Sequence, residues 1–191
     1  NLWGTPPQGC ADYAFQQHIQ KSLNKDNGRS ISLWPHGILF RDSEAEMRRK
    51  MVEQDLVECV IGLGPNLFYN SPMEACLLIT NNNKPKDRKG KVLIVNALKE
   101  VKQEKNIGYL EKNHIQRIYN SYKSFTDEDG FSKIISNETI IENKGSLNIA
   151  QYLSNVTIDV NKMSFNDAFS NWETNSEKLK ESMNDLFQIL N

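Results

Sequence analysis

The chain has 191 residues, with 23 lysines and arginines against 24 aspartates and glutamates, so its formal net charge is −1. At roughly 100 to 200 residues per domain, this length predicts one domain with room for an appendage. The balanced charge excludes a globally basic nucleic-acid-binding domain but leaves room for a local basic patch. No apolar run approaches the roughly 20 residues that span a bilayer, and no signal-peptide pattern opens the chain. We therefore expect a soluble, cytoplasmic protein with no membrane contact.

Cysteine and histidine spacing gives no sign of a metal site. Cys59 and Cys76 lie in apolar runs, which is typical of reduced, buried thiols. No Cys-x-x-Cys pair occurs, and the three histidines are scattered without the spacing of zinc ligands. We therefore expect no metal ion. The chain begins with Asn1 and runs at once into a Gly/Pro-rich opening, which suggests that it was cut from a longer protein.

Short apolar runs predict the strands of one sheet. The run over residues 30–34 is expected to end at Pro35, because proline cannot donate to a strand ladder. Turn residues and polar loops separate it from the later runs. Further strands are expected at residues 56–61, 75–80, 92–96 and 131–135. Since strands alternate with helical patterns, the predicted fold class is α/β.

Helical patterns lie between these strands. Apolar residues at helical spacing predict a helix over residues 12–23. Ser43 and Glu46 match a capping box that opens a second helix, which runs to about residue 54. A third helix is expected to carry Ile115, Ile118, Tyr119 and Tyr122 on one face and to end before Asp127. The polar stretch over residues 143–160 is expected to be irregular.

A heptad pattern lies near the C-terminal end of the sequence, in an expected helix that Ser164 can cap. Its apolar residues recur at alternating four- and three-residue steps, as in a coiled-coil seam. The seam consists of Phe165, Phe169, Trp172, Ser176, Leu179, Met183, Leu186 and Leu190. It either packs on the domain that precedes it or docks a helix of a partner. The candidate partner contacts are Trp172, Leu179, Met183 and Leu186.

The motifs of a self-contained enzyme are missing. Gly62-Leu63-Gly64 has no third glycine and precedes a loop, so it is not a dinucleotide-binding turn. Thr5-Pro6-Pro7-Gln8 invites comparison with the Asn/Asp-Pro-Pro-aromatic tetrapeptide of amino-methylating enzymes. That chemistry needs a carbonyl or carboxylate to hold the amine and an aromatic ring to stack the base. Here Thr5 stands at the position of the acceptor and Gln8 at the position of the aromatic ring, so we interpret this segment as a proline-stiffened loop.

An aromatic loop and two basic clusters are the remaining candidates for chemistry. Phe68 and Tyr69 lie in the loop between two expected strands, where an exposed ring could stack a flipped base. The alternative is that Phe68 plugs the end of the sheet. The basic clusters could face phosphates, or they could be solvated surface. They consist of Arg41, Arg48, Arg49 and Lys50, and of Lys84, Lys86, Arg88, Lys89 and Lys91.

Six segments follow one another in a recognisable order. They are residues 3–15, with Trp3-Gly4-Thr5-Pro6-Pro7; 35–41, with Pro35-His36-Gly37; 60–69, with Gly62-Leu63-Gly64-Pro65-Asn66; and 90–97, 130–133 and 147–152. Their order and approximate spacing resemble those of the methylation (M) subunit of type I restriction-modification systems. The resemblance covers roughly residues 3–153, and only the joint occurrence of the segments is specific.

The resemblance implies a Rossmann-like sheet and the transfer of a methyl group from S-adenosylmethionine to adenine N6 in duplex DNA. Such a subunit acts with a specificity subunit that reads the DNA sequence, and a restriction subunit can join them. The family's glycine-rich cofactor motif and its Asn-Pro-Pro-aromatic motif precede the Trp3 segment and are not in this chain. We therefore expect residues 1–153 to be the distal part of the methyltransferase domain, with no catalytic residue and no activity alone. Residues 154–191 are expected to be a helical assembly segment, and the alternative function is a non-catalytic assembly module.

The resemblance also gives the aromatic loop a role. In related adenine methyltransferases, an aromatic ring between the last two strands of the sheet stacks on the flipped adenine. Phe68 occupies the matching position, with Tyr69 as the alternative; the chain has Met73-Glu74-Ala75 where many members have an Ile-Pro-Thr-like segment. Because a sheet cut in this way leaves backbone groups unpaired along its edge, we expect the isolated chain to self-associate.

Overall fold

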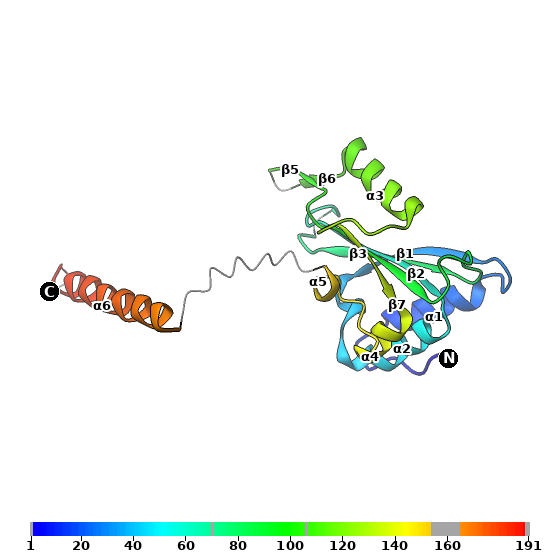
Figure 1. Cartoon of the computed structure of the whole chain (residues 1–191), viewed down its shortest axis with the longest axis horizontal. Coiled ribbons are helices and arrows are strands. Elements are labelled where there is room, and N and C mark those ends of the chain that lie inside the picture. The colour runs from blue at the N-terminus through cyan, green and yellow to red at the C-terminus, as the bar shows by residue number, and fades with distance from the viewer. Residues whose placement is uncertain (1, 70, 106, 154–164, 190–191) are drawn as a thin grey trace. The chain divides into compact units, whose positions relative to one another are not determined.

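The chain divides into two compact units, Asn1–Asn155 and Val156–Asn191. The computed structural model describes residues 2–69, 71–105, 107–153 and 165–189. The first unit holds a sheet with helices on both of its faces, and the second holds one helix (Figure 1).

Five strands form the main sheet of the first unit, in the order β1-β3-β2-β4-β7. They are β1 (Arg29–Pro35), β2 (Val57–Leu63), β3 (Ala75–Asn81), β4 (Lys91–Ala97) and β7 (Ser132–Ser136). β2 and β4 pair in parallel, whereas the other neighbouring strands pair antiparallel. The sheet is therefore mixed. Each strand overlaps an apolar run expected from the sequence, and the α/β class is confirmed.

β1 lies at one edge of this sheet. It ends at Pro35, as expected for a residue that cannot donate to the ladder. Ile31 and Leu33 pair with Ile79 and Leu77 of β3 and remain 68% and 46% exposed, respectively. The edge strand therefore presents apolar side chains to solvent within the described part of the chain.

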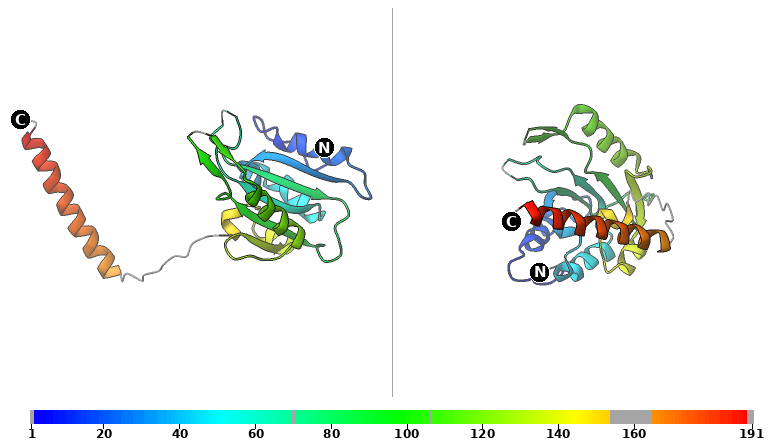
Figure 2. Two further views of the ribbon diagram at one scale, coloured as in Figure 1. Left: turned by 90° about the horizontal axis from the view of Figure 1, so that it is seen from above. Right: turned by 90° about the vertical axis from the view of Figure 1, so that its left-hand side faces the viewer.

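One face of the sheet is covered by four helices (Figure 2). They are α1 (Asp12–Ser22), α2 (Ala45–Glu53), α4 (Asn137–Glu142) and α5 (Ile149–Tyr152). Two short 3-10 turns, η1 (His36–Leu39) and η2 (Asp42–Glu44), lead from β1 into α2. The larger core forms here, where Val60, Leu78 and Ile94 of the sheet meet Met51 and Ile140 of the helices.

The opposite face carries α3 (Lys112–Ser124), with a hairpin of β5 (Lys102–Glu104) and β6 (Ile107–Tyr109) before it (Figure 1). Ile61, Leu93 and Val95 form a second core with Phe125 and Phe131. Alternate residues of β2 and β4 thus enter two different cores, because successive side chains of a strand point to opposite faces. This burial on both faces explains why the strands read as continuous apolar runs.

Two local predictions from the sequence are wrong, and short elements were missed. The capping box at Ser43 is absent: α2 begins at Ala45, and its N-cap, Glu44, makes no side-chain capping bond. The η2 turn takes up Ser43, and Glu46 instead accepts hydrogen bonds from Arg49 on the next turn of the helix. The stretch over residues 143–160 is not wholly irregular, because Asn148 caps α5. The β5–β6 hairpin was not expected, since its strands are only three residues long.

The described part of the second unit is the helix α6 (Phe165–Ile189). The proposed cap, Ser164, lies outside the described residues. The helix ends beyond Leu186, so the expected seam lies in one continuous helix up to that point.

Candidate functional site

The loop from β2 to β3 lies at the carboxyl ends of the parallel strands β2 and β4. Leu63 of β2 pairs with Ala97 of β4 at this end of the sheet. Phe68 packs against the second core and is half-buried, whereas the Tyr69 side chain is wholly exposed at 101%. A hydrogen bond of 3.1 Å from the Ser71 N–H to the Phe68 carbonyl closes the turn that carries both rings. The structure therefore brings the two predicted ring positions together but gives them different surroundings.

The β5–β6 hairpin is hydrogen-bonded to the start of this loop. The Gly108 N–H donates to the Asn66 carbonyl at 2.8 Å, and the Gln103 side-chain amide donates to the Pro65 carbonyl at 3.1 Å. The Asn66 amide donates in turn to Gln103 Oε1 at 3.3 Å. A Cβ at Gly108 would lie 2.8 Å from the Pro65 carbonyl oxygen, so only glycine allows this approach. Loop and hairpin thus form one connected structure.

A cavity of about 640 Å³ opens between the loop and the hairpin tip. This volume is within the range of about 300–1,000 Å³ that is typical of small-molecule sites. Its lining comprises Asn66, Leu67, Phe68, Tyr69, Ser71, Pro72, Lys105 and Ile107. A smaller cavity of about 230 Å³ lies on the β1 side of the loop, lined in part by Leu33, Phe68 and Met73. Phe68 lines both cavities.

His36 follows β1 and lies close to β2. Its Nδ1 is 3.5 Å from a Glu74 carboxylate oxygen, and its buried Nε2 has no hydrogen-bond partner among the described residues. Burial lowers the pKa of His36 below its ordinary value, and the Glu74 carboxylate opposes this effect. A Cβ at Gly62 would lie 3.3 Å from His36 Nε2, so the ring packs directly on β2. The neutral imidazole is therefore the form that this position favours.

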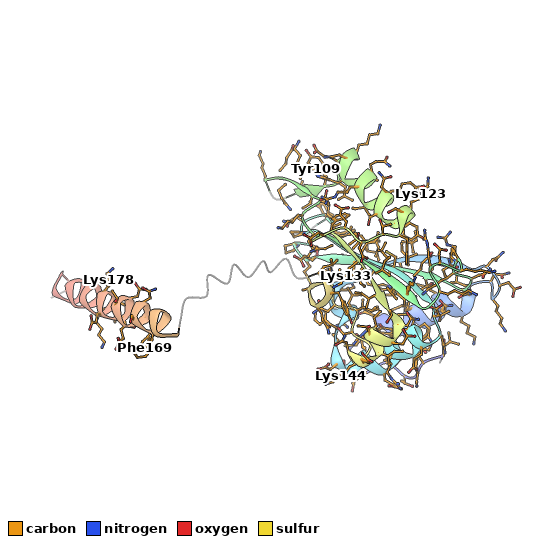
Figure 3. The ribbon with its side chains drawn as sticks, in the orientation of Figure 1. Tyr109, Lys123, Lys133, Lys144, Phe169 and Lys178 are labelled. Atoms are coloured by element: carbon orange, nitrogen blue, oxygen red, sulfur yellow. The ribbon has the colours of Figure 1, made fainter. Side chains whose placement is uncertain are left out.

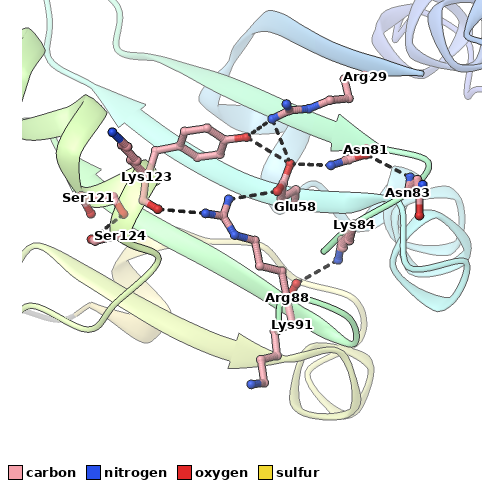
Figure 4. A network of polar contacts seen from close by, with 11 residues as sticks. Arg29, Glu58, Asn81, Asn83, Lys84, Arg88, Lys91, Ser121, Lys123 and Ser124 are labelled. Carbon is pink, nitrogen blue, oxygen red and sulfur yellow. Dashed lines mark hydrogen bonds and ion pairs between the residues drawn. The ribbon is translucent and has the colours of Figure 1, made fainter. Parts of the chain in front are cut away.

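A second polar cluster surrounds Glu58, toward the other end of β2 (Figure 4). The Glu58 side chain is 1% exposed, and Arg88 and Asn81 each donate to it at 3.1 Å. The Tyr122 hydroxyl donates to Glu58 at the same distance and accepts a hydrogen bond from Arg29. Since Tyr122 belongs to α3, the cluster ties that helix to β2 and β3. Each of these five side chains bonds to another member of the cluster, so we assign the cluster a structural role.

Three members of the expected basic clusters, Arg48, Lys84 and Arg88, do not face solvent as a basic surface would. Lys84 has a side chain that is 1% exposed and pairs with Asp55 at 2.6 Å, and burial lowers its pKa. Arg48 is 1% exposed and donates to the carbonyls of Gly145 and Ile38. Arg88 is held by Glu58. Neither alternative, phosphate binding or solvated surface, applies to these three side chains, because they serve as internal hydrogen-bond donors.

The seam of α6 is exposed within its own unit. Phe169, Trp172, Leu179 and Met183 are 47–64% exposed. The ring centroids of Phe169 and Trp172 lie 5.8 Å apart. Figure 3 labels Phe169 and Lys178 on this helix. The structure describes the backbone of Leu186 and Phe165 but not their side chains. Within this unit, the seam is an apolar stripe on the helix surface.

Two classes of site are not found in the part of the chain that the structure describes. No group of three or more His, Cys, Asp or Glu side chains there is arranged to hold a metal ion. None of its helices has both the length and the apolar character needed to cross a membrane.

Comparison with known proteins decides the family. Residues 1–160 match the family model described as N-6 DNA Methylase. The chain belongs to this family. It is 38% identical over 157 residues to the type I restriction enzyme MjaVIII methylase subunit of Methanocaldococcus jannaschii, covering 80% of this chain and 27% of that subunit. It is 32% identical over 139 residues to the HindI methylase subunit of Haemophilus influenzae, covering 68% and 29%.

Solved structures agree with this membership. The type I restriction-modification methyltransferase subunit of Streptococcus thermophilus superposes with a TM-score of 0.74 at 35% identity, over 80% of this chain and 32% of that one. A chain from a type I restriction-modification system structure gives a TM-score of 0.60 at 19% identity over 97% of this chain, a likeness in fold. This N-6 DNA methylase chain spans less than a third of each curated relative described.

Sequence reasoning found the aromatic loop of this methylase chain but missed the hairpin beside it. Lys105 and Ile107 line the larger cavity from the hairpin tip, yet no motif marks them. Gly108 could have indicated this contact, because a glycine between apolar residues often marks a place where another backbone segment approaches closely. What it approaches is a loop about 40 residues earlier in the chain, and local patterns cannot reveal such a contact.

Proposed function

We propose that this chain forms the target-base side of an adenine-N6 DNA methyltransferase, the methylase subunit of a type I restriction-modification system. In this proposal, residues 1–153 are the distal part of its Rossmann-like domain. The supporting observation is the aromatic loop at the carboxyl ends of β2 and β4, in a chain of the N-6 DNA methylase family. Ligands of α/β sheets bind at this end of the strands.

Phe68 is the ring that we propose for stacking the flipped adenine. Phe68 packs against the second core and also lines the larger cavity, so the fold supports this side chain beside the space that a base would enter. Base–aromatic stacking contributes about 1–3 kcal/mol per base. Tyr69 is the alternative, but its wholly exposed side chain would lose rotational freedom on binding. The chain's own contribution is to hold the base outside the duplex and exclude water from one side of it.

S-adenosylmethionine, which supplies the methyl group, does not fit the described residues. A nucleotide-like cofactor of this fold needs glycines that open a strand-to-helix turn to the ligand. Gly62 and Gly64 stand at a strand end, but a Cβ there would meet the Ile149 side chain at 2.6 Å and the Leu98 carbonyl at 2.6 Å. Protein atoms already fill that space. We propose that the cofactor and the amine-holding Asn-Pro-Pro-aromatic group belong to residues outside this chain, which is then inactive alone.

Calorimetric titration of S-adenosylmethionine into the isolated chain tests whether the cofactor site lies outside this chain. We expect no binding heat above dilution, because the chain lacks the glycine turn. A positive control is the whole methylase under the same conditions. Tight, stoichiometric binding by the isolated chain would show that the cofactor site lies within it.

Assembly is a second candidate function, favoured by the exposed seam of α6. Trp172, Leu179 and Met183 present apolar surface on this helix, and Leu186 continues the pattern in the sequence. We propose that the seam docks a helix of the DNA specificity subunit, in a complex that a restriction subunit can join on duplex DNA. This function is compatible with the first, since it uses a different unit of the chain.

A further inference from the structure

The larger cavity has two walls that come from different parts of the sequence. The β2–β3 loop supplies one wall with Phe68 and Tyr69, and the tip of the β5–β6 hairpin supplies the other with Lys105 and Ile107. The hairpin and the loop lie side by side in two views (Figures 1 and 2). Only the first wall has a role in the function proposed above.

The second wall is fixed relative to the first. The Gly108 N–H bonds to the Asn66 carbonyl at 2.8 Å, one residue after Ile107 and two before Phe68. The Gln103 side chain bonds to both Pro65 and Asn66. These bonds join the flanks of both walls, so the distance across the cavity is set by the fold. A site held in this way loses little entropy when a ligand enters.

The chemistry of the second wall is apolar and cationic. Ile107 is 68% exposed, so its aliphatic surface is accessible to a ligand in the cavity. Lys102 of the same hairpin pairs with Glu111 at 3.0 Å, whereas Lys105 has no ion pair with any described residue. The cavity lining contains no acidic side chain, so the Lys105 ammonium is its charged group.

We propose that the hairpin tip is the second wall of the nucleotide site. Ile107 contacts the flipped nucleotide on the side away from Phe68, and Lys105 pairs with a backbone phosphate beside it. An aromatic ring, an aliphatic side chain and a free ammonium around one cavity match the base, the sugar and the phosphate of a nucleotide. The inference rests on the proposed function, because it assumes that the ligand of this cavity is the target nucleotide.

The charge component is tested by the salt dependence of DNA binding. The Lys105→Ala variant of the whole methylase, bound to its specificity subunit, is titrated with target duplex at several salt concentrations. Each phosphate contact contributes about 0.9 to the slope of log affinity against log salt, so we expect the slope to fall by about that amount. Lys123→Ala, an exposed lysine at the Glu58 end of the sheet, is the matched control and should leave the slope unchanged. An unaltered slope in Lys105→Ala overturns the phosphate contact.

The apolar component is tested with Ile107→Ala. We expect the fluorescence of 2-aminopurine at the target position to rise less on binding, and the single-turnover methylation rate to fall several-fold, because the extruded base loses one wall. Ile115→Ala is the control, since Ile115 is 53% exposed on α3 and lines none of the cavities described. Circular dichroism verifies that both variants fold. Fluorescence and rate equal to those of the control overturn the role of Ile107.

Phe68→Leu separates this inference from the proposed function. If Phe68→Leu loses methylation while Lys105→Ala and Ile107→Ala behave as their controls, the proposed function stands and the hairpin has no part in it. If Phe68→Leu and Tyr69→Ala both retain full activity, the proposed function itself fails. If all three variants are impaired and both controls are not, the two-walled site is supported.

Discussion

At the scale of single residues, the structure separates two neighbouring rings that the sequence cannot rank. Phe68 is half-buried against the second core, and Tyr69 is wholly exposed. Two interpretations of Phe68 are compatible here: that its side chain packs at the end of the sheet, and that its ring stacks on a base. The same side chain packs against the second core and lines the larger cavity, so core packing does not exclude contact with a base.

Buried charges are the residue-scale feature that the sequence predicted least well. Lys84, Arg48 and Arg88 look like surface cations in the sequence, yet each donates hydrogen bonds within the fold. Their acceptors lie on other elements, and one of them is more than 90 residues away in the chain. Of the three, Arg88 belongs to a largely buried ion pair, with Glu58, and removing one partner of such a pair typically costs about 3–5 kcal/mol because the other charge stays buried and unpaired.

His36 gives the stability of the chain a pH dependence. Its pKa is lowered in the folded state, so the unfolded chain takes up a proton first as the pH falls below about 6.5. Stability should therefore fall between pH 7.5 and 5.5, and a His36→Gln variant should lose less over this window. Urea unfolding at the two pH values measures this difference.

The matched control for this titration is His18→Gln, because His18 is an exposed residue of α1. We expect it to lose as much stability on acidification as the original chain does. An equal loss in His36→Gln and His18→Gln would mean that His36 does not carry the effect.

At the scale of elements, long apolar or periodic segments were predictable and short, polar ones were not. All five strands of the main sheet and the helices α1, α3 and α6 lie where apolar patterns place them. The hairpin, α4 and α5 were missed because their strands or turns are too short to show a period. The start of α2 was misplaced because Asp42–Glu44 forms a 3-10 turn where a capping box was expected. The aromatic loop was predictable, and its partner across the cavity was not.

The assembly role of α6 is tested by placing charges in its seam. Leu179→Asp combined with Leu186→Asp should abolish or strongly reduce co-purification of the whole methylase with the specificity subunit, because each buried carboxylate would lack a partner. Thr174→Asp, an exposed position off the heptad seam, adds a charge without touching the stripe and should leave association intact. Undiminished co-purification of the double variant would mean that the seam packs on its own chain instead.

At the scale of the whole molecule, the edge of the sheet limits what the isolated chain can do. β1 is an edge strand with Ile31 and Leu33 exposed beside its unpaired backbone. Such an edge is a template for pairing with another chain. We therefore predict that the isolated chain self-associates with rising concentration in sedimentation velocity experiments.

A charged side chain on the edge strand β1 should reduce the self-association of the isolated chain. Ile31→Lys places an ammonium on the exposed face of β1, a common device against edge pairing, and should shift the population toward monomer. Ile115→Lys on α3 is the matched control and should still associate. Monodisperse monomer for the original chain over a wide concentration range would contradict the prediction.

The central claim is that the β2–β3 loop holds the target adenine, and one measurement tests it most directly. In the whole methylase with its specificity subunit, the single-turnover rate of adenine-N6 methylation is compared between the original protein and Phe68→Leu, which keeps an apolar contact with the second core. Stacking of about 1–3 kcal/mol corresponds to roughly a 5- to 150-fold loss of rate. Tyr69→Ala, measured beside it, should lose less. An unchanged rate in both variants would contradict the account.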